Sequence, residues 1–118
     1  MCEWLTFLML VFGCDVCDPV CKAYLHVGFQ DYDSVRIELV NTCPVRGVQF
    51  YITPPEDFGV ETTRRTEGFL VTYNNRDGAV IILSLEGNKI SPGMGSIVKI
   101  TCDGVCGAYY ISRIKMVF

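Results

Sequence analysis

The sequence predicts an all-β domain, a β-sandwich or barrel of about eight short strands. Two observations favour this class. Apolar and polar residues alternate with period two along most of the chain, and turn-forming residues interrupt that alternation about every 8 to 12 residues. A third observation excludes the alternatives, because no stretch of about ten residues combines helical periodicity with capping residues.

The alternation is clearest over residues 34–39. Val35, Ile37 and Leu39 alternate there with a serine, an arginine and a glutamate. Successive side chains of a strand point to opposite faces of a sheet, so this pattern predicts one buried and one solvated face. Residues 22–27 show the same alternation and are expected to form the first strand.

The remaining strands are expected between clear turn and stop signals. Pro54 and Pro55 end a strand over residues 47–52, because proline cannot donate to a ladder. The segment Asn74–Gly78 predicts a hairpin turn. Residues 79–83 are apolar on both sides, which predicts a strand in the middle of a sheet or under a covered face. Further strands are expected over residues 59–62, 69–73, 96–102 and 108–118.

Composition and charge narrow the function classes. The 118 residues carry 10 Lys and Arg against 13 Asp and Glu, a formal charge of −3, and 50% of the residues are hydrophobic. This is enough apolar material for one packed domain and argues against disorder. The acidic balance argues against a nucleic-acid partner, and we expect the isolated pair Arg64 and Arg65 to lie in a solvated loop.

The amino-terminal segment suggests export. The apolar run Met1–Gly13 is far shorter than the roughly 20 residues needed to span a bilayer, so we expect no transmembrane span. Its length suits a secretory signal, and Val11–Cys14 loosely resembles a lipobox, although Glu3 is unusual at such a start. An apolar edge strand or a truncated gene start is the alternative. We therefore divide the chain into an appendage, 1–21, and a sandwich, 22–118, with an extracellular or cell-surface location.

Seven cysteines are unusually many for a domain of this size. Loss of the first thirteen residues would leave six, a number that permits three disulfides with 15 possible pairings. A bond between Cys102 and Cys106 is the most readily closed, because a tight loop with glycine joins them. Zinc held by Cys14, Cys17 and this pair is the less favoured alternative, because the spacings are not standard; free thiols are a third. The six candidates for disulfides or metal are Cys14, Cys17, Cys21, Cys43, Cys102 and Cys106.

Catalytic chemistry is poorly represented. His26 is the one histidine, and its alternating strand predicts a surface position. No nucleophile elbow or phosphate-binding loop is present, and the carboxylates lie mainly in turns. We expect a binding or structural domain, not an enzyme, without a cofactor.

The order of the motifs resembles that of cohesin domains. Three opening motifs carry the resemblance: Ala23–Gly28, then Ser34–Asn41 with V-x-I-x-L-x-N, then Pro44–Ile52 with G-x-Q-F. Later motifs keep step over residues 77–84, 90–100 and 110–114, so the match covers about residues 22 to 118. The resemblance implies a jelly-roll β-sandwich of eight to nine strands that binds a small dockerin-type domain.

The resemblance also implies contact residues on one sheet face, on strands over residues 47–52, 69–73, 80–85 and 96–100. On the first of these, Val48 and Phe50 are expected in the core, so their neighbours face the partner. The candidate partner-binding residues are Gly47, Gln49, Tyr51, Ser84, Glu86 and Met94. The alternative is that each is an ordinary surface residue.

Two other functions remain open. A carbohydrate-binding module on the same type of sandwich would stack a polysaccharide on a planar row of aromatic side chains, for which Tyr32, Tyr51, Tyr73, Tyr109 and Tyr110 are available. A structural domain stapled by disulfides or zinc would need no separate partner.

Overall fold

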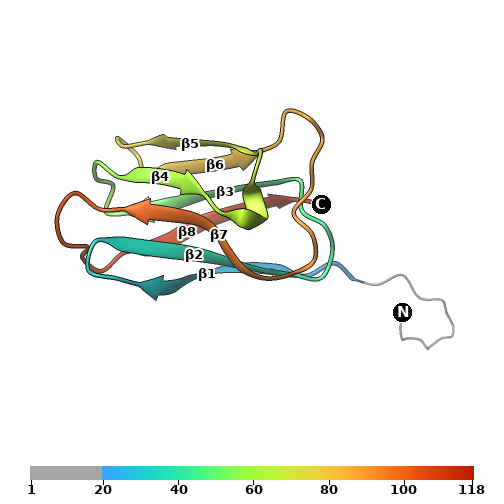
Figure 1. The fold of residues 1–118 in the computed structure, drawn as a ribbon, viewed down its shortest axis with the longest axis horizontal. Helices are drawn as coiled ribbons and strands as arrows, with labels where there is room; N and C mark the ends of the chain where they lie inside the picture. The colour runs from blue at the N-terminus through green and yellow to red at the C-terminus, as the bar shows by residue number, and fades with distance from the viewer. Residues whose placement is uncertain (1–19) are drawn as a thin grey trace, which may run out of the picture.

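The chain forms two four-stranded antiparallel sheets packed face to face, in a computed structural model that describes residues 20–118 (Figure 1). The N-terminal segment with Cys2, Cys14 and Cys17, and with the expected signal or lipobox, lies outside the described residues. Eight strands make up the sheets: β1 (Ala23–Gln30), β2 (Ser34–Asn41), β3 (Gly47–Thr53), β4 (Gly59–Thr62), β5 (Leu70–Asn74), β6 (Ala79–Leu83), β7 (Gly93–Thr101) and β8 (Tyr110–Val117).

Strands that are adjacent in space pair the two halves of the chain in reverse order, from the outermost strands inward. One sheet has the order β1-β2-β7-β4 and the other β5-β6-β3-β8. Thus β2 pairs with β7 and β3 with β6, while β4 contacts β5, and β1 contacts β8, across the sandwich. Such nesting over two sheets is typical of a jelly roll, and the predicted all-β sandwich is confirmed.

Strand β2 shows how the sequence pattern produces the core. Val35, Ile37 and Leu39 are buried, whereas Arg36 and Glu38 between them are only half-buried. The inward side chains of both sheets meet in one hydrophobic core. Burial of the apolar, inward-facing side chains of each strand therefore holds the two sheets together.

Strand β6 lies in the middle of its sheet, as its uniformly apolar sequence predicts. It pairs with β5 on one side and β3 on the other. Val80 and Ile82 face the core and are fully buried, whereas Ile81 and Leu83 point to the outer face and are half-buried. The outer face of this sheet therefore carries apolar side chains at its centre.

The predicted turn between β5 and β6 depends on Gly78. Its backbone N–H donates to the carbonyl oxygen of Asn74 at 2.8 Å, and its φ is 82°. A side chain there would collide with the backbone carbonyl of Ile52. Only glycine meets both requirements without strain.

Arg65 corrects the expectation of a solvated loop. Residues Arg64–Thr66 form a 3₁₀ turn, η1, that packs on β7. The Arg65 guanidinium donates to the carbonyl oxygens of Leu39 at 2.6 Å, Gly95 at 3.1 Å and Ser91 at 2.9 Å. It also donates to Oδ1 of Asn41 at 2.7 Å, and burial lowers the pKa of Arg65. Arg65 therefore fastens the turn to β2 and β7, while Arg64 is exposed.

The four cysteines of the described residues form two disulfides. Cys102 bonds to Cys106, as predicted, with a Cα–Cα distance of 5.4 Å. Cys21 bonds to Cys43 with a Cα–Cα distance of 5.3 Å, so the last residue of the expected appendage is tied to the loop after β2. The zinc alternative required Cys102 and Cys106 as thiolates, and the disulfide removes both.

Candidate functional site

The central candidate residues lie on the outer face of the β5-β6-β3-β8 sheet. Gln49 and Tyr51 on β3 are half-buried there, as is Gly47, because Val48 and Phe50 turn into the core. The direction predicted for the side chains of this strand is therefore confirmed. Strand β3 is an inner strand, so these residues have β6 on one side and β8 on the other.

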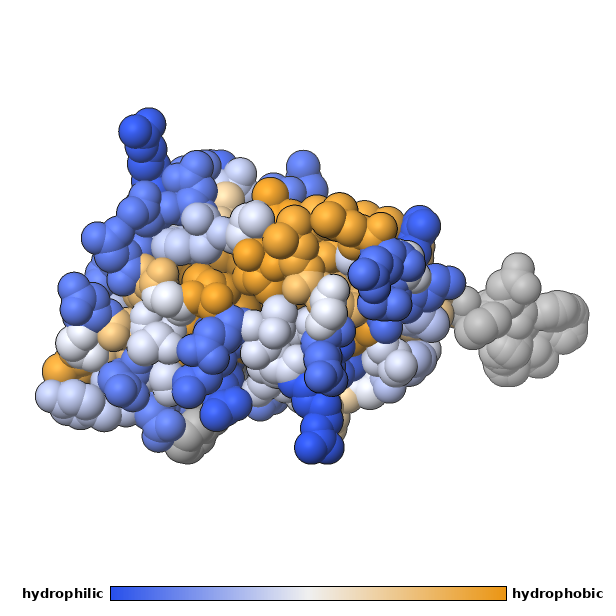
Figure 2. Space-filling view, turned by 45° about the horizontal axis from the view of Figure 1, so that its top comes forward, coloured by the Kyte–Doolittle hydropathy of each residue, from blue (hydrophilic) through white to orange (hydrophobic). Residues whose placement is uncertain are grey.

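An apolar group surrounds Gly47. This residue pairs with Leu83 of β6 and with Val117 of β8, and Leu83 in turn pairs with Leu70 of β5. Leu70 is 44% exposed and Val117 is 52% exposed. Apolar side chains of three strands, β5, β6 and β8, therefore surround Gly47 at this end of the outer face. Figure 2, in which the β5 edge of the sandwich is turned forward, shows hydrophobic surface along this edge of the molecule.

A mixed group surrounds Gln49. It pairs with Ile81 of β6 and with Lys115 of β8. A shallow hollow of about 230 Å³ spans both the apolar group around Gly47 and the mixed group around Gln49. The outward-facing residues that line it are Gly47, Gln49, Ile81, Leu83, Lys115 and Val117. Sequence reasoning missed the β8 residues, whose alternation alone does not say which strand they pair with.

The far end of β3 is polar. The guanidinium of Arg113 lies 5.1 Å from the centre of the Tyr51 ring, a cation–π contact. Arg113 sits where the register between β3 and β8 shifts, and its φ is 51°. Bulges of this kind re-aim a side chain, and here Arg113 is turned over the outer face. Tyr51 and Arg113 line a second, polar hollow together with Thr53, Asp77 and Ser112.

Three candidate residues do not join this face. Met94 is 75% exposed but lies on β7, in the other sheet, so the expectation that residues 96–100 share the contact face is wrong. Ser84 and Glu86 lie in the loop after β6, where the Ser84 hydroxyl accepts from the backbone N–H of Glu86 at 3.2 Å and of Asn88 at 2.9 Å. Ser84 thus shapes the loop, and Glu86 is exposed.

The tyrosines do not form the row that sugar stacking requires. Tyr32 lies in the turn between β1 and β2, while Tyr73 and Tyr109 pack against the core. Tyr51 and Tyr110 alone lie on β3 and β8 at the outer face, and Arg113 covers Tyr51. The described residues therefore offer a polysaccharide no aromatic platform of three rings.

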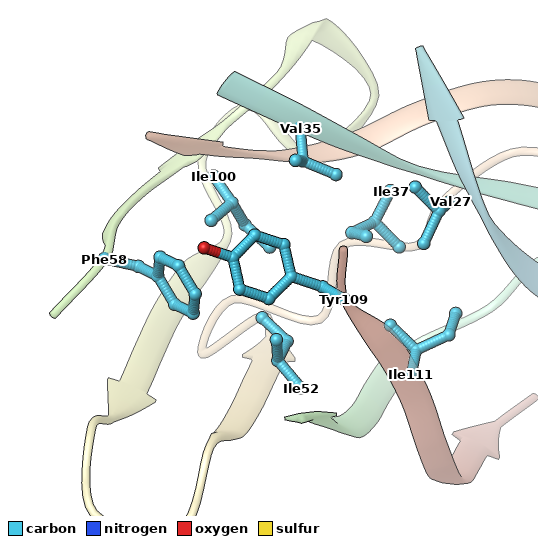
Figure 3. Close-up of a pocket in the computed structure, with 8 residues that line it drawn as sticks. All are labelled: Val27, Val35, Ile37, Ile52, Phe58, Ile100, Tyr109 and Ile111. Carbon is cyan, nitrogen blue, oxygen red and sulfur yellow. The ribbon is translucent and has the colours of Figure 1, made fainter. Parts of the chain in front are cut away.

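The interior provides no ligand site among the described residues. A cavity of about 10 Å³ lies between the sheets (Figure 3), lined by Val27, Val35, Ile37, Ile52, Phe58, Ile100, Tyr109 and Ile111. One water molecule needs about this volume and polar partners as well. Figure 3 shows Tyr109 and Phe58 side by side at this cavity. The two rings pack edge to face, with their centroids 5.1 Å apart. The cavity is a packing gap.

Tyr73 closes the same end of the core. Its hydroxyl donates to the carbonyl oxygen of Glu56 at 2.6 Å and accepts from the N–H of the same residue at 3.1 Å. Burial raises the pKa of Tyr73. This hydroxyl holds the loop before β4 and is a structural group.

His26 occupies a surface position on β1. Its Nε2 lies 3.2 Å from Oε1 of Glu38, its cross-strand neighbour, in the sheet opposite the candidate face. Within residues 20–118 no group of three His, Cys, Asp or Glu side chains is arranged to hold a metal ion. No helix in that range is long and apolar enough to cross a membrane.

Comparisons with protein-family models, with curated proteins and with solved structures found no match to this chain. The likeness to cohesin domains therefore depends on the sequence motifs described above.

Proposed function

We propose that this chain is a non-catalytic protein-binding module that docks a partner on the outer face of the β5-β6-β3-β8 sheet. The observation that carries the proposal is the composition of this face. Leu83, Ile81 and Val117 lie beside Gln49, Tyr51 and Lys115 on adjacent strands. Apolar side chains at one end of the face thus adjoin an aromatic and several polar side chains toward the other end, and protein interfaces combine apolar and aromatic contacts with polar ones.

A dockerin-type domain is the partner we propose. The cohesin-like motifs support it, as does the topology, since three of the four strands expected to carry the contact lie in one sheet. A standard interface would bury about 800 Å² on each partner. An extracellular or cell-surface location completes the proposal, and the two disulfides are consistent with an oxidising compartment.

Calorimetric titration against a panel of isolated dockerin domains tests this function. We expect binding at micromolar concentration or tighter, and Leu83→Glu should weaken it at least about tenfold because it places a charge in the apolar group of the face. Met94→Glu is the matched control, because Met94 is an exposed apolar residue on the opposite sheet. Thermal unfolding of both variants checks that the fold is intact.

Two results would contradict the proposal. One is an absence of binding to every dockerin domain at micromolar concentration. The other is weaker binding by the Met94 variant with unchanged binding by the Leu83 variant, which would move the contact to the β1-β2-β7-β4 sheet.

A further inference from the structure

Each sheet has two edge strands, and three of the four carry a feature that hinders pairing with another chain. Strand β1 has an irregular register between Val27 and Gln30. Strand β4 has only four residues, one of them Glu61. Strand β8 has a register shift and carries Arg113 and Lys115. Bulges, short length and charges are the usual protection of free edges.

Strand β5 has none of these features. Its five residues read Leu-Val-Thr-Tyr-Asn, without charge or proline, and they pair with β6 in an unbroken register. In Figure 1 it runs along the margin of its sheet, with β6 on one side only. A regular, uncharged edge is the type that accepts another strand.

We propose that β5 pairs with β5 of a second copy of this chain, antiparallel, about a two-fold axis at Thr72. The two β5-β6-β3-β8 sheets would then continue into one another across the dimer. This proposal does not depend on the docking function described above.

Self-complementarity of the strand favours a second copy over another occupant. Pairing about Thr72 sets Thr72 opposite Thr72, Val71 opposite Tyr73, and Leu70 opposite Asn74. Thr–Thr pairs and aromatic pairs with β-branched residues are among the favourable cross-strand contacts. No charge of the strand opposes a like charge, and a contact in which each copy uses the same patch closes as a dimer.

The surroundings of β5 also favour burial. Leu70 is 44% exposed at the start of the strand, and Leu85, two residues after its neighbour Leu83, is 79% exposed. Figure 2, which turns the β5 edge of the sandwich forward, shows hydrophobic surface along this edge. Gln49 and Tyr51 lie on inner strand β3, so the part of the candidate docking face on β3 and β8 stays open on both copies.

Sedimentation velocity of the full chain, with free thiols alkylated to prevent intermolecular disulfides, tests this pairing over about 1 to 500 µM. We expect a reversible monomer–dimer equilibrium. Thr72→Lys should raise the dissociation constant at least about tenfold, because two like charges would meet at the axis. Thr62→Lys is the matched control, an exposed threonine on the edge strand β4 of the other sheet, and should leave the equilibrium unchanged.

A charge-swap experiment locates the axis. Thr72→Lys and Thr72→Glu should each be monomeric alone, whereas an equimolar mixture should form a heterodimer through a Lys–Glu pair. The proposal is overturned if the wild-type chain is monomeric at the highest concentration, if the Thr62 variant weakens the dimer as much as the Thr72 variant, or if the mixture stays monomeric. Each of these readings is independent of dockerin binding.

Discussion

Arg65 shows how one side chain can organise several backbone segments. Its guanidinium donates four hydrogen bonds to oxygen atoms of β2, β7 and the loop before β7. Arg65→Ala leaves these partly buried acceptors without a partner, so we expect the free energy of unfolding to fall by about 2 to 4 kcal/mol. Urea denaturation followed by circular dichroism measures this loss.

Two variants separate the geometry of Arg65 from its charge. Arg65→Lys should recover only part of the loss, because an ammonium group cannot reproduce the planar fork of a guanidinium. Arg64→Ala should change the stability by less than about 0.5 kcal/mol, since Arg64 is exposed. Equal stability of the Arg64 and Arg65 alanine variants would refute the structural role of Arg65.

Tyr73 gives the stability a dependence on alkaline pH. Burial raises the pKa of Tyr73 in the folded chain. In the unfolded chain the pKa of tyrosine is about 10. The neutral phenol is therefore favoured by folding, and its contribution is complete below pH ~10 and is lost as the pH rises through the folded pKa. We expect the free energy of unfolding to fall more steeply above pH ~10 in the wild type than in Tyr73→Phe. Tyr32→Phe, which removes the hydroxyl of an exposed tyrosine, is the matched variant for comparison.

At the scale of elements, period-two alternation was sufficient to place the strands. It predicted β2 with its observed inner residues, and the turn and stop signals gave β4 and β6 their observed bounds. The end of β2 and the ends of the other strands were shifted by one to three residues. It also predicted which side of β3 faces out, because the pleat alone decides that. It could not say that β8, and not β7, lies beside β3, since strand neighbours are set by long-range pairing. Lys115 and Val117 were missed for this reason, and Met94 was included.

The disulfide between Cys21 and Cys43 fixes the start of β1 to the end of β2. The two cysteines are 22 positions apart in the chain, and closing a loop of this length in the unfolded state is worth about 3 kcal/mol. Replacing both with serine should lower the free energy of unfolding by about that amount, as measured by urea denaturation. Cys43→Ser alone should give the same loss, because either change breaks the bond. Stability equal to that of the wild type would mean that the bond does not form in solution.

At the scale of the whole molecule, the sandwich separates the core from the proposed docking face. The inward-facing side chains of the strands form one core, with a gap too small for a ligand. The outward-facing side chains of one sheet present apolar groups to solvent. The same alternation thus supplies both surfaces. This is why the sequence predicted the fold and part of the candidate face, whereas Arg65 and Arg113 depend on contacts that no local pattern encodes.

A chain that begins at residue 20 should fold as stably as the full chain. Residues 20–118 contain both described disulfides and a core built from both sheets, and a domain of this size can be stable on apolar burial alone. We expect one cooperative calorimetric transition with a midpoint within about 2 °C of that of the full chain. Deletion of β8 is the contrasting variant, because it removes the strand paired with β3 and should abolish the transition. Loss of the transition in the chain from residue 20 would show that residues 1–19 contribute to the fold, and would overturn the description of the N-terminal segment as an appendage.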